Sequence, residues 1–231
     1  MASSIEIKSL TKRYGNVTAL SSINLTVEEG KIVGLLGPNG SGKSTFFKCL
    51  SGLLEYEGDI KIHGKGVGHE TKAIVSYLPE RTYLDMNMTA KEVFSTFKTF
   101  YADFDIDRAY ELLDTLKVSK DARLRTLSKG TKEKIQLIAV MARKAKVYLL
   151  DEPIGGVDPA AREFIIKTIL TRVNEGSTII ISTHLIRDIE DFLDEYIFFN
   201  ESRLVASGSV HSLHEQGKTV DEEFREVFRC F

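Results

Sequence analysis

Gly37-Pro38-Asn39-Gly40-Ser41-Gly42-Lys43-Ser44-Thr45 is the stretch that decides the fold of this 231-residue chain. Its glycines, lysine and hydroxyl have the spacing of a phosphate-binding loop. An apolar strand pattern over 31–36 precedes the stretch, and an apolar helical pattern over 46–50 follows it. A strand, a glycine-rich loop and a helix in that order direct backbone N–H groups and the N-terminus of the helix at phosphate oxygens. The order favours a nucleotide site over glycines that merely turn the chain.

We expect this loop to hold the phosphates of a nucleotide in three ways. Backbone amides of the glycine-rich turn approach the phosphate oxygens, the ammonium of Lys43 bridges the β- and γ-phosphates, and the hydroxyl of Ser44 is a ligand of Mg²⁺. The predicted nucleotide-binding residues of the loop are Gly37, Asn39, Gly40, Gly42, Lys43, Ser44 and Thr45.

A second stretch, Val147-Tyr148-Leu149-Leu150-Asp151-Glu152, is an apolar strand that ends in two carboxylates. An aspartate at the end of a buried strand is suited to hold Mg²⁺, and the next carboxylate is suited to orient and deprotonate the water that attacks the γ-phosphate. The alternative is that Asp151 or Glu152 only caps the turn before Pro153. Because the chain also carries a phosphate-binding loop, we favour Asp151 as a metal ligand and Glu152 as the general base.

Hydrophobic patterns on either side of these motifs predict an α/β fold. Strands and helices alternate from residue 147 onward, with strands over 147–150, 178–181 and 196–199 and helices over 160–173 and 185–193. Such alternation is typical of a mainly parallel sheet with helices on both faces. Residues 81–145 have helical patterns throughout, which indicates an insertion into the α/β core. The tail from Ser207 onward reads as one further amphipathic helix.

Composition excludes several classes of protein. With 31 Lys and Arg against 33 Asp and Glu, the formal net charge is −2, which argues against a nucleic-acid partner. Only two cysteines occur, at positions 49 and 230, and their spacing indicates neither a disulfide framework nor a zinc site. No apolar stretch reaches the roughly 18 to 20 residues that span a bilayer, and residues 1–8 lack a secretory pattern. We therefore expect a cytoplasmic protein, joined to any membrane by a partner.

The stretch Leu127-Ser128-Lys129-Gly130-Thr131 places a serine and a glycine at the start of a helical pattern. A serine there is also an ordinary helix cap. Because the stretch comes shortly before the strand with Asp151 and Glu152, the chain resembles the ATP-binding-cassette (ABC) family, the ATP-hydrolysing subunits of ABC transporters. In that family the signature is usually Leu-Ser-Gly-Gly-Gln. The resemblance implies that Ser128 and Gly130 contact the γ-phosphate of ATP bound to a second cassette.

The same resemblance covers nearly the whole chain and implies further roles. Tyr14 matches the aromatic residue that stacks on adenine. Glu80 lies where the family usually has a glutamine that touches Mg²⁺ and the attacking water. The stretch Gly155-Gly156-Val157-Asp158 matches a loop whose aspartate acts between subunits, and His184 matches the histidine that senses the γ-phosphate. Tyr14 as a packed turn residue and His184 as an ordinary helix-start histidine are the alternatives.

The resemblance also implies an architecture and partners. We expect one ABC ATPase domain over 1–231, with a RecA-like P-loop NTPase core of mainly parallel sheet over 1–80 and 146–231. An antiparallel β part lies near the amino end, and residues 81–145 form a helical subdomain. The implied partners are a second ABC ATPase chain, identical or different, and an integral membrane permease that holds the protein at the inner face of the membrane.

Three positions depart from the family pattern: Lys129 and Thr131 in the signature, and Glu80 in place of glutamine. Ser128 and Gly130 are kept, and a carboxylate at position 80 remains a hard oxygen ligand for Mg²⁺. The departures resemble the bacterial exporter branch, in which separate subunits move drugs, peptides or lipids outward. The apolar loop Tyr83–Met88 follows Glu80 where the family docks a permease helix, and its methionines suit a surface that repacks against a partner.

Two other functions remain as alternatives. One is a non-transport ABC ATPase in DNA repair, chromosome organisation or translation, although such relatives usually carry long coiled coils, zinc hooks or two cassettes. The other is a nucleotide or small-molecule kinase, which shares the phosphate-binding loop but does not need Ser128, Gly130 and the Asp151–Glu152 pair in this arrangement.

Overall fold

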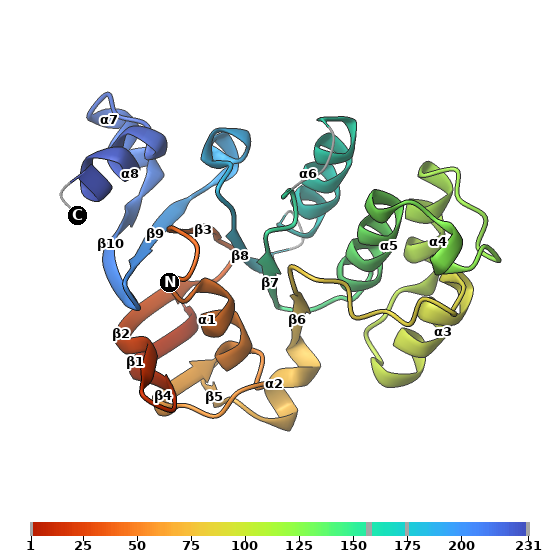
Figure 1. Cartoon of the computed structure of the whole chain (residues 1–231), viewed down its shortest axis with the longest axis horizontal. Coiled ribbons are helices and arrows are strands. Elements are labelled where there is room, and N and C mark those ends of the chain that lie inside the picture. The colour runs from red at the N-terminus through yellow and green to blue at the C-terminus, as the bar shows by residue number, and fades with distance from the viewer. Residues whose placement is uncertain (1, 156–158, 174–175, 230–231) are drawn as a thin grey trace.

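Two β-sheets of different kinds organise the protein in a computed structural model, which describes residues 2–155, 159–173 and 176–229 (Figure 1). The smaller sheet is antiparallel and has the strand order β2-β1-β4-β5. Its strands are β1 (Ser3–Tyr14), β2 (Val17–Glu28), β4 (Glu57–Ile62) and β5 (Lys65–Gly66). This sheet is the antiparallel β part that was expected near the amino end.

The larger sheet has six strands in the order β10-β9-β3-β8-β7-β6. Neighbouring strands are parallel except for the hairpin of β9 and β10 at one edge. Its strands are β3 (Ile32–Leu36), β6 (Val75–Leu78), β7 (Val147–Asp151), β8 (Thr178–Ser182), β9 (Glu195–Asn200) and β10 (Arg203–Ser209). Every residue of β3, β7 and β8 is buried, as expected for parallel strands with both faces covered. The prediction of a mainly parallel α/β sheet is confirmed.

Helix α1 (Lys43–Leu50) packs between the two sheets and joins their cores. Its two phenylalanines are fully buried, and Phe46 meets Phe199 of β9 edge to face at 5.2 Å. The patterns did not indicate the short helix α2 (His69–Ile74), which leads into β6. Because α1 is fixed on both sides, the loop that precedes it has a rigid end.

Between β6 and β7 lies a group of three helices with a hydrophobic core of its own, on the far side of β6 and β7 from the antiparallel sheet in Figure 1. The helices are α3 (Ala90–Phe100), α4 (Ile106–Thr115) and α5 (Lys129–Met141). A capping box begins α3, because Thr89 Oγ1 accepts a hydrogen bond from Glu92 N and Glu92 Oε2 accepts one from Thr89 N. Among the described helices, none is long and apolar enough to cross a membrane.

The helix predicted over 185–193 is wrong. The segment instead forms two 3-10 turns, Ile186–Asp188 and Glu190–Phe192. Side chains tie these turns to other elements: Asp188 pairs with Arg162 of α6 (Pro159–Val173) at 2.7 Å, and Arg187 pairs with Asp221 at 2.8 Å. Such ties to two separate elements favour tight turns over a regular helix.

The single helix predicted for the tail is also wrong, because β10 occupies 203–209 and two helices follow it. Gly217, at a φ of +73°, separates α7 (Val210–Glu215) from α8 (Val220–Arg229). Glu190, in the turn after His184, is buried and accepts hydrogen bonds from Val220 N at 2.6 Å and from the ring of His214. The tail is therefore fastened to the segment that follows His184.

Cys49 is fully buried in α1, and burial raises the pKa of its thiol to about 11. At pH 8 only about one thiol in a thousand is then ionised, and the thiolate is the reactive form. We expect iodoacetamide at pH 8 to leave Cys49 unmodified in the native protein and to alkylate it fully in guanidinium. Peptide mass spectrometry measures both, and native modification at the denatured rate would contradict the burial.

Candidate active site

Four segments of the parallel sheet bring their functional residues to the same edge. The phosphate-binding loop follows β3, Asp151 and Glu152 lie at the end of β7, and His184 comes soon after β8. Glu80 follows β6. Ligands of open parallel sheets bind outside the carboxyl ends of the strands, which is where all of these residues lie.

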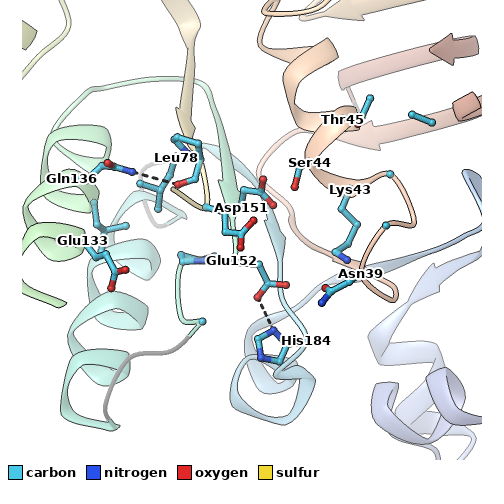
Figure 2. Close-up of a pocket in the computed structure, with 18 of the residues that line it drawn as sticks. Asn39, Lys43, Ser44, Thr45, Leu78, Glu133, Gln136, Asp151, Glu152 and His184 are labelled. Carbon is cyan, nitrogen blue, oxygen red and sulfur yellow. Dashed lines mark hydrogen bonds and ion pairs between the residues drawn. The ribbon is translucent and has the colours of Figure 1, made fainter. Parts of the chain in front are cut away.

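A cavity of about 580 Å³ occupies this edge of the sheet. Ten of the residues predicted from the sequence line it, and Figure 2 shows Lys43, Asp151 and Glu152 pointing into one space. The ten are Asn39, Gly40, Gly42, Lys43, Ser44, Thr45, Glu80, Asp151, Glu152 and His184. The cavity is large enough for a ligand of the size that protein pockets typically hold.

Two glycines of the loop are required by close contacts. A Cβ atom on Gly37 would lie 2.2 Å from the carbonyl oxygen of Phe199, and one on Gly42 would lie 2.5 Å from that of Ala19. Gly42 also has a φ of +109°, where an L side chain is strained. Any larger residue at these positions would push the loop away from β9 or β2, so the glycines fix the path of the backbone around the cavity.

Lys43 is buried at the floor of the cavity. Its Nζ donates hydrogen bonds to the carbonyl oxygens of Gly37 at 2.8 Å and of Pro38 at 3.0 Å. Burial lowers the pKa of the Lys43 amine, while the carboxylates of Glu152 and Asp151 act in the opposite direction. The ammonium is thus held inside the loop and next to the acidic residues of the neighbouring strand.

Asp151 is almost completely buried, with 3% of its surface exposed. Ser182 donates a hydrogen bond to its Oδ1 at 2.8 Å. Burial raises the pKa of the Asp151 carboxyl, whereas hydrogen bonds from Ser44 and Ser182 lower it. A cation would relieve the cost of keeping this carboxylate ionised.

The oxygen donors here fit a magnesium ion that also binds phosphate. The described residues contain no cluster of three or more His, Cys, Asp or Glu side chains that could hold a metal alone. The Ser44 hydroxyl and the carboxylates of Asp151 and Glu80 are hard oxygen ligands, and Mg²⁺ commonly takes one or two carboxylates together with substrate phosphates and water. The donor set therefore suits a metal that arrives with a nucleotide.

Glu152 occupies an unusual backbone conformation, with a φ of +51°. Its N–H donates to both the carbonyl oxygen and the hydroxyl of Ser182, at 3.1 and 3.0 Å, which holds this conformation. The Oε2 atom lies 2.9 Å from Nδ1 of His184, as Figure 2 shows. The side chain of Glu152 is 14% exposed and that of His184 is 60% exposed. The main chain thus aims the carboxylate into the cavity, and the imidazole orients it.

Other predicted residues lie outside this cavity. Tyr14, at the end of β1, is 47% exposed and has Lys12 Nζ 5.2 Å from the centre of its ring. Gly37 lies behind the loop, against β9. Tyr14 is not among the residues that line the cavity, and its stacking on adenine stays a prediction. Asp158, with Gly156 and Val157, falls outside the described residues.

Ser128 and Gly130 are likewise absent from the lining of the cavity, although Lys129 contributes to it. Ser128 is the N-cap of α5, and its Oγ accepts a hydrogen bond from Thr131 N at 3.2 Å. The Thr131 hydroxyl lies 2.8 Å from the same Oγ. Thr131, which stands where the family signature usually has glutamine, therefore orients Ser128. The ordinary capping role considered from the sequence is therefore present.

Sequence patterns missed two polar residues of α5 that line the cavity, Glu133 and Gln136. Gln136 is 3% exposed and hydrogen-bonds to the main chain on both sides of Glu80. A polar residue inside the apolar run 135–141 was the available signal, because buried amides have hydrogen-bond partners. The sequence pattern could not show that these hydrogen-bond partners are main-chain atoms of Pro79 and Tyr83.

Comparison with known proteins identifies the family to which this chain is similar. A family model described as ABC transporter matches residues 20–155. The Nod factor export ATP-binding protein I of Burkholderia orbicola (strain AU 1054) is 32% identical, over 91% of this chain and 72% of that protein. The SkfA peptide export ATP-binding protein SkfE of Bacillus subtilis (strain 168) is 28% identical, over 96% of this chain and 95% of that protein. A solved structure of an ATP binding subunit of an ABC transporter superposes with a TM-score of 0.88 at 28% identity, over 97% of this chain and 99% of that one.

Proposed function

The chain belongs to the ABC transporter family as an ATP-binding ATPase subunit, and from this membership we propose that it powers the export of a drug, peptide or lipid through a separate permease. The observation that carries the proposal is the cavity in which Lys43, Asp151 and Glu152 meet at the carboxyl edge of the sheet. The relatives whose names record export favour transport over DNA repair, chromosome organisation or translation.

In the proposed mechanism, the loop and Lys43 bind the triphosphate. Backbone amides and the ammonium match phosphate charge with groups that are already in place, which lowers the cost of reorganisation during the reaction. Ser44, Asp151 and Glu80 hold Mg²⁺, which when bound neutralises charge that develops on the phosphates.

Glu152 is suited to position a water molecule for attack on the γ-phosphate and to take its proton. Its carboxylate is fixed by the main-chain bonds to Ser182 and by the contact with His184 Nδ1. Fixing the base in one orientation contributes to rate because the reacting atoms do not have to be brought together in the transition state. We assign His184 the role of orienting Glu152 and of contacting the γ-phosphate.

A second cassette completes the site in this proposal. Ser128 and Gly130 lie at the N-terminus of α5, outside the cavity of their own chain. The N-terminus of a helix favours an anion, and the exposed cap leaves room for one. We propose that ATP is held between the loop of one chain and Ser128 and Gly130 of another, so that binding closes the pair and hydrolysis reopens it.

We place the protein at the inner face of the cell membrane, attached through its permease. An ATPase is separated from a kinase by measuring phosphate release: we expect release from MgATP without any phosphorylated acceptor. Co-expression with its permease should retain the subunit in the membrane fraction. Transfer of phosphate to a small molecule, or an unchanged distribution after co-expression, would contradict the respective part of the proposal.

The permease contact is proposed to include the loop Tyr83–Met88, within residues 81–145. Tyr83 is 53% exposed, and Met86 packs against the core of the helical group. Tyr83→Asp places a charge in an apolar contact, so we expect transport to fall by about 10-fold or more while ATP binding stays unchanged. Transport of substrate into vesicles and nucleotide affinity are the measurements.

Phe100→Asp is the matched control for Tyr83→Asp, because Phe100 is a second aromatic residue of the helical group, at the end of α3, and is 77% exposed. We expect this variant to transport normally. Normal transport by Tyr83→Asp would remove the loop from the interface, and loss of transport in Phe100→Asp alone would move the interface to α3.

A further inference from the structure

Gln136 joins two parts of the site that are far apart in sequence. It lies in the middle of α5 among apolar residues and is 3% exposed. Its Oε1 accepts a hydrogen bond from Tyr83 N at 3.2 Å, and its Nε2 donates one to the carbonyl oxygen of Pro79 at 3.3 Å. Figure 2 shows the amide pointing from α5 toward the end of β6.

These two bonds hold both ends of the loop that carries Glu80. The side chains between them, including Glu80 itself, are exposed, so packing alone does little to fix the main chain there. An amide is well suited to this task because it is a donor and an acceptor at once and carries no charge. A buried amide that has found both partners costs little, whereas one that loses a partner destabilises its surroundings.

The other end of the connection is the start of α5. Lys129, Glu133 and Gln136 all line the cavity, and their spacing puts them on one face of the helix. Ser128 caps this helix about two turns before Gln136. The helix is therefore a continuous structural connection between the Glu80 loop and Ser128.

We propose that Gln136 is a positioning residue, which holds Glu80 at the cavity and ties the Glu80 loop to the helix whose tip carries Ser128. Glu80 and Ser128 then move together when a nucleotide with its Mg²⁺ binds. The inference rests on the proposed function, in which Glu80 is a ligand of the nucleotide-bound metal. It adds Gln136 as the residue that connects Glu80 to Ser128.

The test compares Gln136→Leu with Ser76→Ala in the full-length chain. Leucine has a similar size but neither polar atom. Ser76 is the matched control, because its buried Oγ donates to the carbonyl oxygen of Val140 at 3.0 Å and thus also joins β6 to α5, but away from the loop. Both variants lose a buried hydrogen bond to α5, but only Gln136→Leu releases the loop that carries Glu80.

Two measurements that do not depend on turnover decide the outcome. Exchange of the amide hydrogens of residues 80–83 should be faster in Gln136→Leu and unchanged in Ser76→Ala. Calorimetry with ADP should show that the wild type binds ADP more tightly with Mg²⁺ than in EDTA. In Gln136→Leu we expect this Mg²⁺-dependent increase in ADP affinity to be about 10-fold smaller, with the affinity in EDTA unchanged. Equal effects in both variants, or no effect in Gln136→Leu, would overturn the proposal.

A double-mutant cycle with Glu80→Ala tests whether Gln136 acts through Glu80. If it does, Gln136→Leu adds nothing to the loss of the Mg²⁺-dependent gain in Glu80→Ala; additive losses would refute it. If Gln136→Leu does not fold, Gln136→Glu, which keeps the acceptor for Tyr83 N, replaces it in every measurement. A wild type without any Mg²⁺-dependent gain would reject the proposed function as well, whereas a normal gain in both proteins rejects only the role of Gln136.

Discussion

Glu152→Gln is expected to lower the kcat of ATP hydrolysis by about 100- to 10,000-fold, because it removes the general base but keeps the shape of the side chain. The unusual backbone at this position should persist, since the hydrogen bonds that hold it run from the main-chain N–H to Ser182. Steady-state phosphate release measures the loss. ATP affinity should change little, because the loop and Lys43 are untouched.

The same variant should form a dimer that ATP stabilises. Without hydrolysis the triphosphate stays bound between the loop of one chain and Ser128 of the other, so the pair cannot reopen. Size-exclusion chromatography in saturating MgATP should show a dimer for Glu152→Gln, and a monomer with ADP. A monomer in MgATP would argue against the shared site.

Glu163→Gln is the matched control for Glu152→Gln. Glu163 lies on α6, is exposed and pairs with Lys167 at 2.6 Å, outside the lining of the cavity. It makes the same change of charge on the surface and should hydrolyse ATP at the wild-type rate. Equal losses in both variants would point to net charge rather than to a base.

Lys43→Ala is expected to weaken ATP binding by about 10- to 100-fold, which corresponds to the roughly 1.5–3 kcal/mol of a hydrogen bond to a charged group. Hydrolysis should fall further, by about 100- to 1,000-fold, because the ammonium also stabilises charge that develops in the transition state. Calorimetry gives the affinity and phosphate release gives the rate.

Lys48→Ala separates this effect from a general loss of positive charge. Lys48 lies on the same helix, α1, but is exposed and does not line the cavity. Alanine favours helix at both positions, so both variants should keep α1. We expect Lys48→Ala to bind and hydrolyse ATP normally. Brisk hydrolysis by Lys43→Ala would remove the loop from the catalytic site.

Local motifs of the site could be predicted from sequence because each is a short pattern with its own chemistry. The stretch Gly37–Thr45 and the pair Asp151–Glu152 each combine a buried strand with polar residues at its end, and parallel strands bring such ends to one edge. The contact between Glu152 and His184 depends on β7 and β8 being neighbours. Strand order is a property of the whole sheet, so the sequence patterns could not predict that Glu152 and His184 are in contact.

The errors have a shared physical cause. Over 185–193 the apolar spacing suits a helix, but the conformation is decided by ion pairs and hydrogen bonds to Arg162, His214 and α8, which lie elsewhere in the chain. In the tail, the amphipathic pattern predicted one helix, but Gly217 at positive φ ends α7 before α8 begins. Gln136 was missed for the same reason, since its partners belong to the loop after β6.

Helices α7 and α8 are bonded to the turn that follows His184, so they can affect the position of this histidine although they contact no phosphate ligand. Val220 N and His214 share the carboxylate of Glu190, and Asp221 holds Arg187. We expect substitutions in α7 and α8 to change the rate of ATP hydrolysis while the nucleotide contacts stay as they are.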